Sequence, residues 1–167
     1  RTAQGVIGMR VEEGDEVVSA FAVKEDEIED TSKLTVTESG YGKRTPLEKY
    51  RVTNRGVKGV INIKIVDKNG PVVTSMPVPY EAGDSNMSLI NSDGVLIKVR
   101  ISDIRNMGRS TQGVKVMRIK GDQKLVMASS VIDEDDEDEI VADEEVVDQE
   151  NLEEKGEPTD IPDEEEN

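Results

Sequence analysis

The sequence lacks cysteine, histidine and tryptophan, and it has only one phenylalanine and three tyrosines among 167 residues. Without cysteine it can form no disulfide and offers no thiol nucleophile or thiolate metal ligand, which fits a reducing cytosol. Without histidine it lacks the usual general base and the commonest metal ligand. No apolar run is long enough to span a membrane, and there is no secretory signal. We therefore expect a non-catalytic segment without a metal, whose core consists of aliphatic side chains.

A short apolar motif occurs three times along the chain. The copies begin at Gly5, Gly56 and Gly113, and each is Gly-Val followed by further apolar residues. A polar turn and a pair of apolar residues follow each copy in the same order. Matching hairpin turns lie at 38–40 and 92–94, at nearly the same spacing. A period of about 50 residues predicts an array of similar units, such as the four-stranded blades of a propeller.

Each unit contains short runs of valine, isoleucine and leucine bounded by glycine, asparagine, aspartate or proline, which is typical of β-strands. No segment before residue 132 has the 3.6-residue apolar period of an amphipathic helix. The sequence thus predicts an all-β fold of propeller-like blades, with about two and a half repeats (1–50, 51–108 and 109–131) in residues 1–131. The third repeat supplies only its first two strands. The strands expected in the first two repeats are 6–11, 17–23, 33–37, 41–46, 57–66, 72–78, 86–91 and 95–100.

The net charge of −16 is the sum of two very different parts. Residues 1–130 carry 20 basic and 17 acidic residues, a net charge of +3, whereas residues 131–167 carry 20 acidic residues and one lysine, a net charge of −19. We expect residues 132–167 to be a disordered acidic tail, because the charges repel one another and little apolar surface can be buried. Residues 39–120 carry 15 basic and 6 acidic residues spread over several hairpins. This predicts a positive stripe that fits a polyanion.

The densest basic cluster is the hairpin region from Gly40 to Gly59, where Glu48 is the only acidic residue. Its glycines let the backbone approach a phosphate closely. A sparser cluster around Gly108 and Gly113 echoes it. The plain alternative for any one of these side chains is an ordinary exposed cation. The predicted phosphate contacts are Lys43, Arg44, Lys49, Arg51, Arg55, Lys58, Arg105, Arg109 and Lys115.

Two motifs imitate ligand sites without meeting their requirements. Gly40–Thr45 resembles a phosphate-binding glycine loop, but Pro46 follows it where a helix should begin. The acidic run 133–144 resembles a calcium loop, but Asp138 stands where the turn requires glycine. We therefore predict no metal and no cofactor in this segment.

Four strings carry a family resemblance: GMRVEEGDEVV, GYGKRTPLEKYRV, RGVKGVINIKI and GRSTQGVKVMRI. They closely resemble the C-terminal domain of the DNA gyrase A subunit, over residues 1 to about 131. The resemblance implies a β-pinwheel, a propeller-like disc in which blades exchange strands and a basic rim wraps duplex DNA. The positions that match this rim are Lys43, Arg44, Arg51, Arg55, Lys58, Arg109 and Lys115.

The resemblance also implies a setting for the whole protein. That setting is a bacterial, nucleoid-associated type II topoisomerase in the cytoplasm, with two A and two B subunits, that introduces negative supercoils. Its use of ATP and Mg²⁺ would depend on regions absent from this chain, and the catalytic tyrosine region has no counterpart here. The chain does not open with methionine and reads as a segment of a longer protein. We expect it to bind duplex DNA without sequence preference and without cleaving it.

One departure from the family keeps alternatives open. The hallmark box of a glutamine, basic residues and a glycine pair with lysine is incomplete in residues 54–59, where Asn54 lacks a preceding glutamine and Val57 interrupts the glycine pair. The C-terminal domain of the topoisomerase IV A subunit is therefore one alternative. A protein-interaction propeller without a nucleic-acid role is another.

Overall fold

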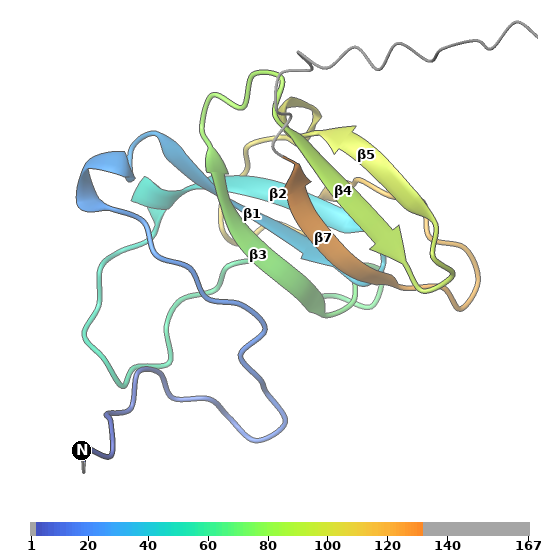
Figure 1. Ribbon diagram of the computed structural model, residues 1–167. Helices are drawn as coiled ribbons and strands as arrows, with labels where there is room; N and C mark the ends of the chain where they lie inside the picture. The colour runs from blue at the N-terminus through green and yellow to red at the C-terminus, as the bar shows by residue number, and fades with distance from the viewer. Residues whose placement is uncertain (1–2, 132–167) are drawn as a thin grey trace, which may run out of the picture. The chain divides into compact units, whose positions relative to one another are not determined.

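The computed structural model describes residues 3–131 (Figure 1). The chain divides into two units, residues 1–135 and 136–167, and all described residues belong to the first. The predicted acidic tail, residues 132–167, lies outside the described residues. Within residues 3–131, no helix is long and apolar enough to cross a membrane.

The described residues form β-strands joined by turns and by three short 3-10 helices, so the all-β prediction is confirmed. The 3-10 helices are η1 (Glu25–Glu27), η2 (Leu47–Lys49) and η3 (Ile101–Asp103). The strands are β1 (Thr31–Thr37), β2 (Tyr41–Pro46), β3 (Val72–Pro79), β4 (Asn86–Asn91), β5 (Leu96–Arg100), β6 (Val114–Lys115) and β7 (Leu125–Val131).

The strands form two antiparallel sheets, and each sheet takes strands from more than one repeat. The first sheet has the order β3-β1-β2-β6 and the second has the order β5-β4-β7. In the first, β1 and β2 come from the first repeat, β3 from the second and β6 from the third. In the second, β4 and β5 come from the second repeat and β7 from the third. This is the exchange of strands between blades that the resemblance implies.

A constant shift along the chain relates the two sheets. It carries the hairpin glycine Gly40 to Gly94, with φ of 76° and 79°, and η2 to η3. It also carries Asn69 to Gln123, whose side-chain oxygens accept hydrogen bonds from the N–H groups of Val66 and Lys120 at 2.8 and 3.1 Å. The repeat seen in the sequence is therefore a structural repeat.

The hydrophobic core lies between the two sheets (Figure 1). Leu34 and Val36 of β1 and Met87 and Leu89 of β4 are all fully buried in it. Side chains on a strand alternate between its faces, so Lys33 and its neighbours at positions 35, 43 and 45 lie on the opposite face of the first sheet. Hydrogen bonds connect that face, including Thr35 Oγ1 to Ser75 Oγ at 3.0 Å and Asn62 Nδ2 to Thr35 Oγ1 at 2.9 Å. The first sheet is thus covered on both faces.

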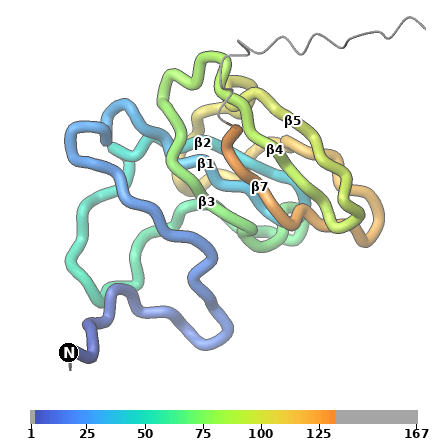
Figure 2. Tube along the Cα trace, viewed as in Figure 1, coloured from blue at the N-terminus to red at the C-terminus, as the bar shows by residue number. Residues whose placement is uncertain are grey.

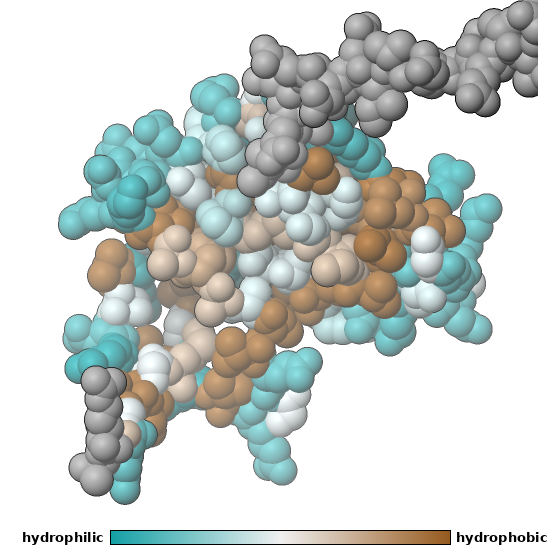
Figure 3. Space-filling model, viewed as in Figure 1, coloured by the Kyte–Doolittle hydropathy of each residue, from teal (hydrophilic) through white to brown (hydrophobic). Residues whose placement is uncertain are grey.

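Three of the predicted strands, 6–11, 17–23 and 57–66, form no sheet ladder, so these predictions were wrong. An isolated parallel bridge joins Met9 to Val57, and the two traces run close together there (Figure 2). Apolar side chains stay at the surface, with Val6 72% and Ile61 64% exposed, and hydrophobic atoms are visible along this part of the molecule (Figure 3). Apolar alternation predicts a strand, but a ladder also needs a partner strand, and residues 3–131 supply only this single bridge.

Gly40 and Gly94 provide a matched test of how tightly the third repeat packs on the first hairpin. A Cβ on Gly40 would lie 2.3 Å from the carbonyl oxygen of Met117, whereas one on Gly94 would meet nothing within 4 Å. Both glycines have positive φ, so alanine costs about 1–2 kcal/mol at either. We expect Gly40→Ala to lower the free energy of unfolding by about 1–3 kcal/mol more than Gly94→Ala does, because the added Cβ overpacks this site. Urea denaturation measures the loss of stability in both variants, and equal losses would contradict the close approach.

Candidate nucleic-acid interface

The nine predicted phosphate contacts divide between the surface and the interior. Lys43 is fully buried and Arg44 is 7% exposed. Arg109 is half-buried. The other six are exposed: Lys49, Arg51, Arg55, Lys58, Arg105 and Lys115.

Four of the surface cations occupy equivalent places on the loops that follow the first and second hairpins. Arg51 follows η2 as Arg105 follows η3, and Arg55 and Arg109 lie at the next equivalent position along each loop. Arg51 and Arg105 are separated by the same number of residues as the hairpin glycines Gly40 and Gly94, and so are Arg55 and Arg109. The fold therefore places a pair of arginines on each loop that leaves a hairpin.

Few carboxylates compete for these cations. Lys49 pairs with Glu48 at 2.9 Å, and Lys58 pairs with Glu12. Among residues 3–131, Arg51, Arg55 and Arg105 form no ion pair. Exposed ion pairs contribute at most about 1 kcal/mol, so Lys49 and Lys58 can also exchange their partners for a phosphate.

Two tyrosines hold cations beside their rings. Lys68 and Lys115 lie 5.7 and 5.3 Å from the centre of the Tyr41 ring. Lys33 and Arg109 lie 5.4 and 6.0 Å from that of Tyr50. Such contacts contribute about 0.5–1 kcal/mol at exposed sites, so they orient Arg109 and Lys115. The sequence gives no sign of the roles of Lys33 and Lys68, because these contacts join segments far apart in the chain.

The two buried cations donate hydrogen bonds to the loop after η3 and to Tyr80, which follows β3. Lys43 Nζ donates to the carbonyl oxygens of Gly108 and Arg109, both at 2.7 Å, and to Thr111 Oγ1 at 3.3 Å. Arg44 Nε donates to the carbonyl oxygen of Ile104 at 2.7 Å, and its Nη1 donates to that of Tyr80 at 3.0 Å. These cations already have partners in the interior, and the prediction of phosphate contact is left with the seven surface members of the set.

The physical reason is the position of β2 inside its sheet. Strand β1 pairs along one edge of β2, and β6 with the loop after η3 covers the other edge, where Arg44 forms an isolated bridge with Asn106. Both faces are also covered, so every residue from Gly42 to Thr45 is buried. A sequence pattern shows a cation after a hairpin turn, but not that a loop of the next repeat will cover it.

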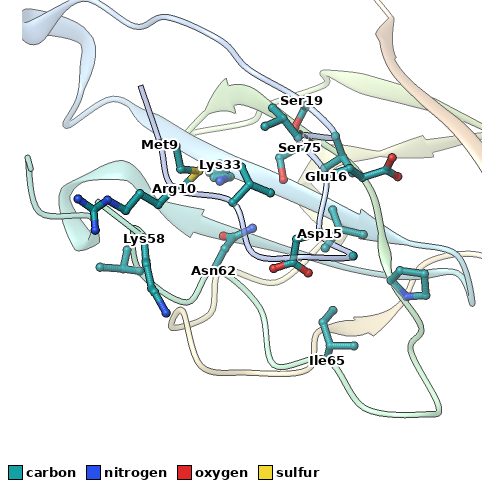
Figure 4. Close-up of a pocket in the computed structure, with 17 residues that line it drawn as sticks. Met9, Arg10, Asp15, Glu16, Ser19, Lys33, Lys58, Asn62, Ile65 and Ser75 are labelled. Carbon is teal, nitrogen blue, oxygen red and sulfur yellow. Dashed lines mark hydrogen bonds between the residues drawn. The ribbon is translucent and has the colours of Figure 1, made fainter. Parts of the chain in front are cut away.

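A groove with a cavity volume of about 770 Å³ lies beside the first sheet (Figure 4). Its lining mixes Arg10, Lys33 and Lys58 with Asp15 and Glu16, and the acidic side chains lie toward the opposite end from Arg10. The mixed charge does not favour an anion over a cation. Within residues 3–131, no group of histidine, cysteine or acidic side chains could hold a metal ion.

The family model described as DNA gyrase C-terminal domain, beta-propeller, matches residues 1–24, 34–79 and 86–131. The chain belongs to the DNA gyrase C-terminal domain family. The DNA gyrase A subunit of Staphylococcus aureus strain NCTC 8325 / PS 47 is 40% identical over 144 residues, covering 86% of this chain and 16% of that protein. The same protein of strain MRSA252 is 39% identical over 142 residues, covering 83% of this chain and 16% of the relative. The chain thus spans a small part of these relatives.

Two solved structures have the same fold. A DNA gyrase A C-terminal domain superposes with a TM-score of 0.68 and 30% identity, covering 77% of this chain and 42% of that one. The C-terminal domain of DNA topoisomerase IV gives a TM-score of 0.64 at 21% identity, covering 75% of this chain and 38% of the other, which shows a shared fold alone. The resemblance to the gyrase A C-terminal domain is confirmed, and the chain is a C-terminal domain of the type II topoisomerase kind.

Burial gives Lys43 a distinctive pH signature. Burial first, and then the charges of Lys33 and Arg109, lower the pKa of Lys43 from 10.5 to about 8. Between these two pH values the unfolded chain keeps a proton that the folded chain has lost, so the contribution of Lys43 to stability increases as the pH rises from about 8 to 10.5. Urea denaturation at about pH 7.5 and about pH 9.5 should show the wild type gaining stability relative to Lys43→Met. If the stabilities of the wild type and of Lys43→Met change equally between the two pH values, burial does not lower the pKa of this lysine.

Proposed function

We propose that this domain binds duplex DNA through its phosphates, without sequence preference, and that it contributes DNA wrapping to a type II topoisomerase. The observation that carries the proposal is the set of equivalent arginines on the loops after the two hairpins, where Arg51 corresponds to Arg105 and Arg55 to Arg109. A repeated cation on a repeated loop presents charge at regular intervals. A duplex likewise presents its phosphates at regular intervals.

The form of the surface favours phosphate contact over base readout. The cations lie on loops or, for Lys49 and Lys115, at the last residue of η2 and β6. No α-helix among residues 3–131 is available to enter a major groove. Contacts to phosphates fix position and orientation but do not read sequence. The proposed contact set is Lys49, Arg51, Arg55, Lys58, Arg105, Arg109 and Lys115.

For the whole protein, we propose the role that the name of its relatives states, that of a DNA gyrase A subunit. This chain would then bind DNA beside a catalytic core formed by the rest of the A subunit and by the B subunit, as an A2B2 enzyme in the bacterial nucleoid. ATP and Mg²⁺ would act in those other regions to drive negative supercoiling.

The salt dependence of binding tests phosphate contact directly. Each phosphate neutralised lowers log K by about 0.9 per unit of log salt concentration. If six contacts form, raising the salt from about 50 to 200 mM costs on the order of a thousandfold in affinity of the full chain for a duplex of arbitrary sequence. Fluorescence anisotropy at several salt concentrations gives the slope. A flat response would favour the alternative of a protein-interaction propeller.

Charge reversal at equivalent positions tests where the contacts lie. The variant Arg51→Glu with Arg105→Glu should lose at least about tenfold in DNA affinity, because two phosphate contacts become repulsions. The matched control is Lys24→Glu with Lys124→Glu, which makes the same charge change at exposed lysines that pair with Glu27 and Glu38. Both variants should keep the circular dichroism of the wild type, since exposed charges contribute little to stability. Equal losses from the two variants would point to diffuse attraction.

A further inference from the structure

The loop after η3 is held by two consecutive residues of β2 whose side chains lie on opposite faces. Lys43 binds the loop at Gly108, Arg109 and Thr111, and Arg44 binds it at Ile104. The backbone of Arg44 adds two hydrogen bonds, donating to the carbonyl oxygen of Arg105 at 3.2 Å and accepting from the N–H of Met107 at 2.8 Å. Residues 104–111, hereafter the arginine loop, are therefore held at both ends.

We propose that Lys43 and Arg44 are positioning residues, which fix the arginine loop so that Arg105 and Arg109 face the same duplex, and which do not contact phosphate themselves. This inference rests on the proposed function. It reassigns the basic pair of the GYGKRT string from the DNA surface to the scaffold beneath it. The cations that remain on the surface are then set in place by cations in the interior.

The chemistry of the lysine fits its three partners. An ammonium group has three donors and no acceptor, and Lys43 Nζ meets two carbonyl oxygens and one hydroxyl oxygen. A buried carbonyl without a partner is unfavourable. Removing the ammonium would leave the carbonyl of Arg109 without this donor and that of Gly108 with the Thr111 hydroxyl alone, and would therefore loosen the loop so that water could reach these carbonyls. The neutral amine still has two N–H donors, enough for the two carbonyls.

The internal repeat argues against a general need for this lysine in the sheet. The shift that relates the two sheets takes Lys43 to Ile97 and Arg44 to Lys98, and the second hairpin still pairs in the same register, with Leu89 opposite Ile97. Lys98 is exposed where Arg44 is buried. The described residues of the second sheet include no strand along the outer edge of β5. Buried cations thus occur in the hairpin that the arginine loop covers, and not at the equivalent positions of the second hairpin.

Fixing the loop in advance should increase affinity. A loop that is already ordered loses less conformational entropy on binding. Arg109 illustrates the arrangement, because its carbonyl oxygen is held by Lys43 while its guanidinium lies over Tyr50. Main chain and side chain of the same residue are both held, while Arg105 stays exposed beside it.

A double-mutant cycle on DNA affinity tests the inference with the full chain. Lys43→Met alone should weaken binding to a duplex on the order of tenfold at about 100 mM salt. In the background Arg105→Gln/Arg109→Gln, the same change should cost less than about twofold, because the cations that it positions are gone. A direct phosphate contact by Lys43, or a global loss of structure, would instead give additive losses and would overturn the proposal.

Amide hydrogen exchange without DNA provides the readout of the loop itself. Lys43→Met should raise the exchange of amides in residues 105–111 and leave those of β4 and β7 unchanged. Ile97→Met is the matched control at the equivalent place in the second sheet. Should Lys43→Met fail to fold, Thr111→Val removes one acceptor of Lys43 together with the hydroxyl that donates to the carbonyl oxygen of Gly108, and it should produce the same pattern with a smaller loss of affinity. Exchange of the loop as slow as in the wild type, in whichever variant folds, would overturn the proposal.

The failures of the two proposals are distinguishable. If Arg105→Gln/Arg109→Gln binds DNA as the wild type does, the proposed contact set is wrong, whatever Lys43 does. If that variant binds weakly and Lys43→Met binds as the wild type does, the contact set stands and the positioning role is overturned. The variant Arg44→Lys adds a check, because lysine keeps the positive charge but replaces the two nitrogens that bind separate carbonyls with a single one, so it should restore part of the affinity lost in Arg44→Met.

Discussion

The structure depends on strands that one repeat supplies to the sheet of another. Strand β1 is paired along its whole length with β3 of the following repeat, and β4 is paired in the same way with β7. Neither hairpin could cover its central strand from its own repeat. Because consecutive repeats are joined in this way, the loops that leave the hairpins recur at a fixed spacing. The placement of the surface arginines follows from that pairing.

Much of this could be predicted from sequence because turns and apolar runs are local signals. The glycine turns near 40 and 94 and the strands at 33–37, 41–46, 72–78, 86–91 and 95–100 form close to where the patterns place them. The segments 6–11 and 57–66 carry equally good apolar patterns but form no ladder. A β-strand forms only when a second strand pairs with it, and a sequence pattern describes only one of the two strands.

The same limit explains which part of the interface could be predicted. Arg51 and Arg105, which the sequence predicts as phosphate contacts, are exposed because no distant segment covers them, and their contact with DNA stays a prediction. Lys43 and Arg44 have the same local appearance, a cation just after a hairpin turn, yet a loop from the next repeat buries them. Whether a lysine meets solvent or a carbonyl depends on long-range packing, on which neighbouring residues carry no information. The GYGKRT string therefore marks the family and its scaffold together.

The central claim is that the equivalent loops after the two hairpins contact one duplex, and directed cleavage of DNA tests it most directly. Because the chain has no cysteine, a single Arg51→Cys, Arg105→Cys or Lys24→Cys substitution can carry an iron-chelate probe that cuts nearby DNA backbone. We predict cutting of bound duplex from positions 51 and 105, and little from position 24. Cutting from position 24 as strong as from the other two, or none from position 105, would contradict the claim.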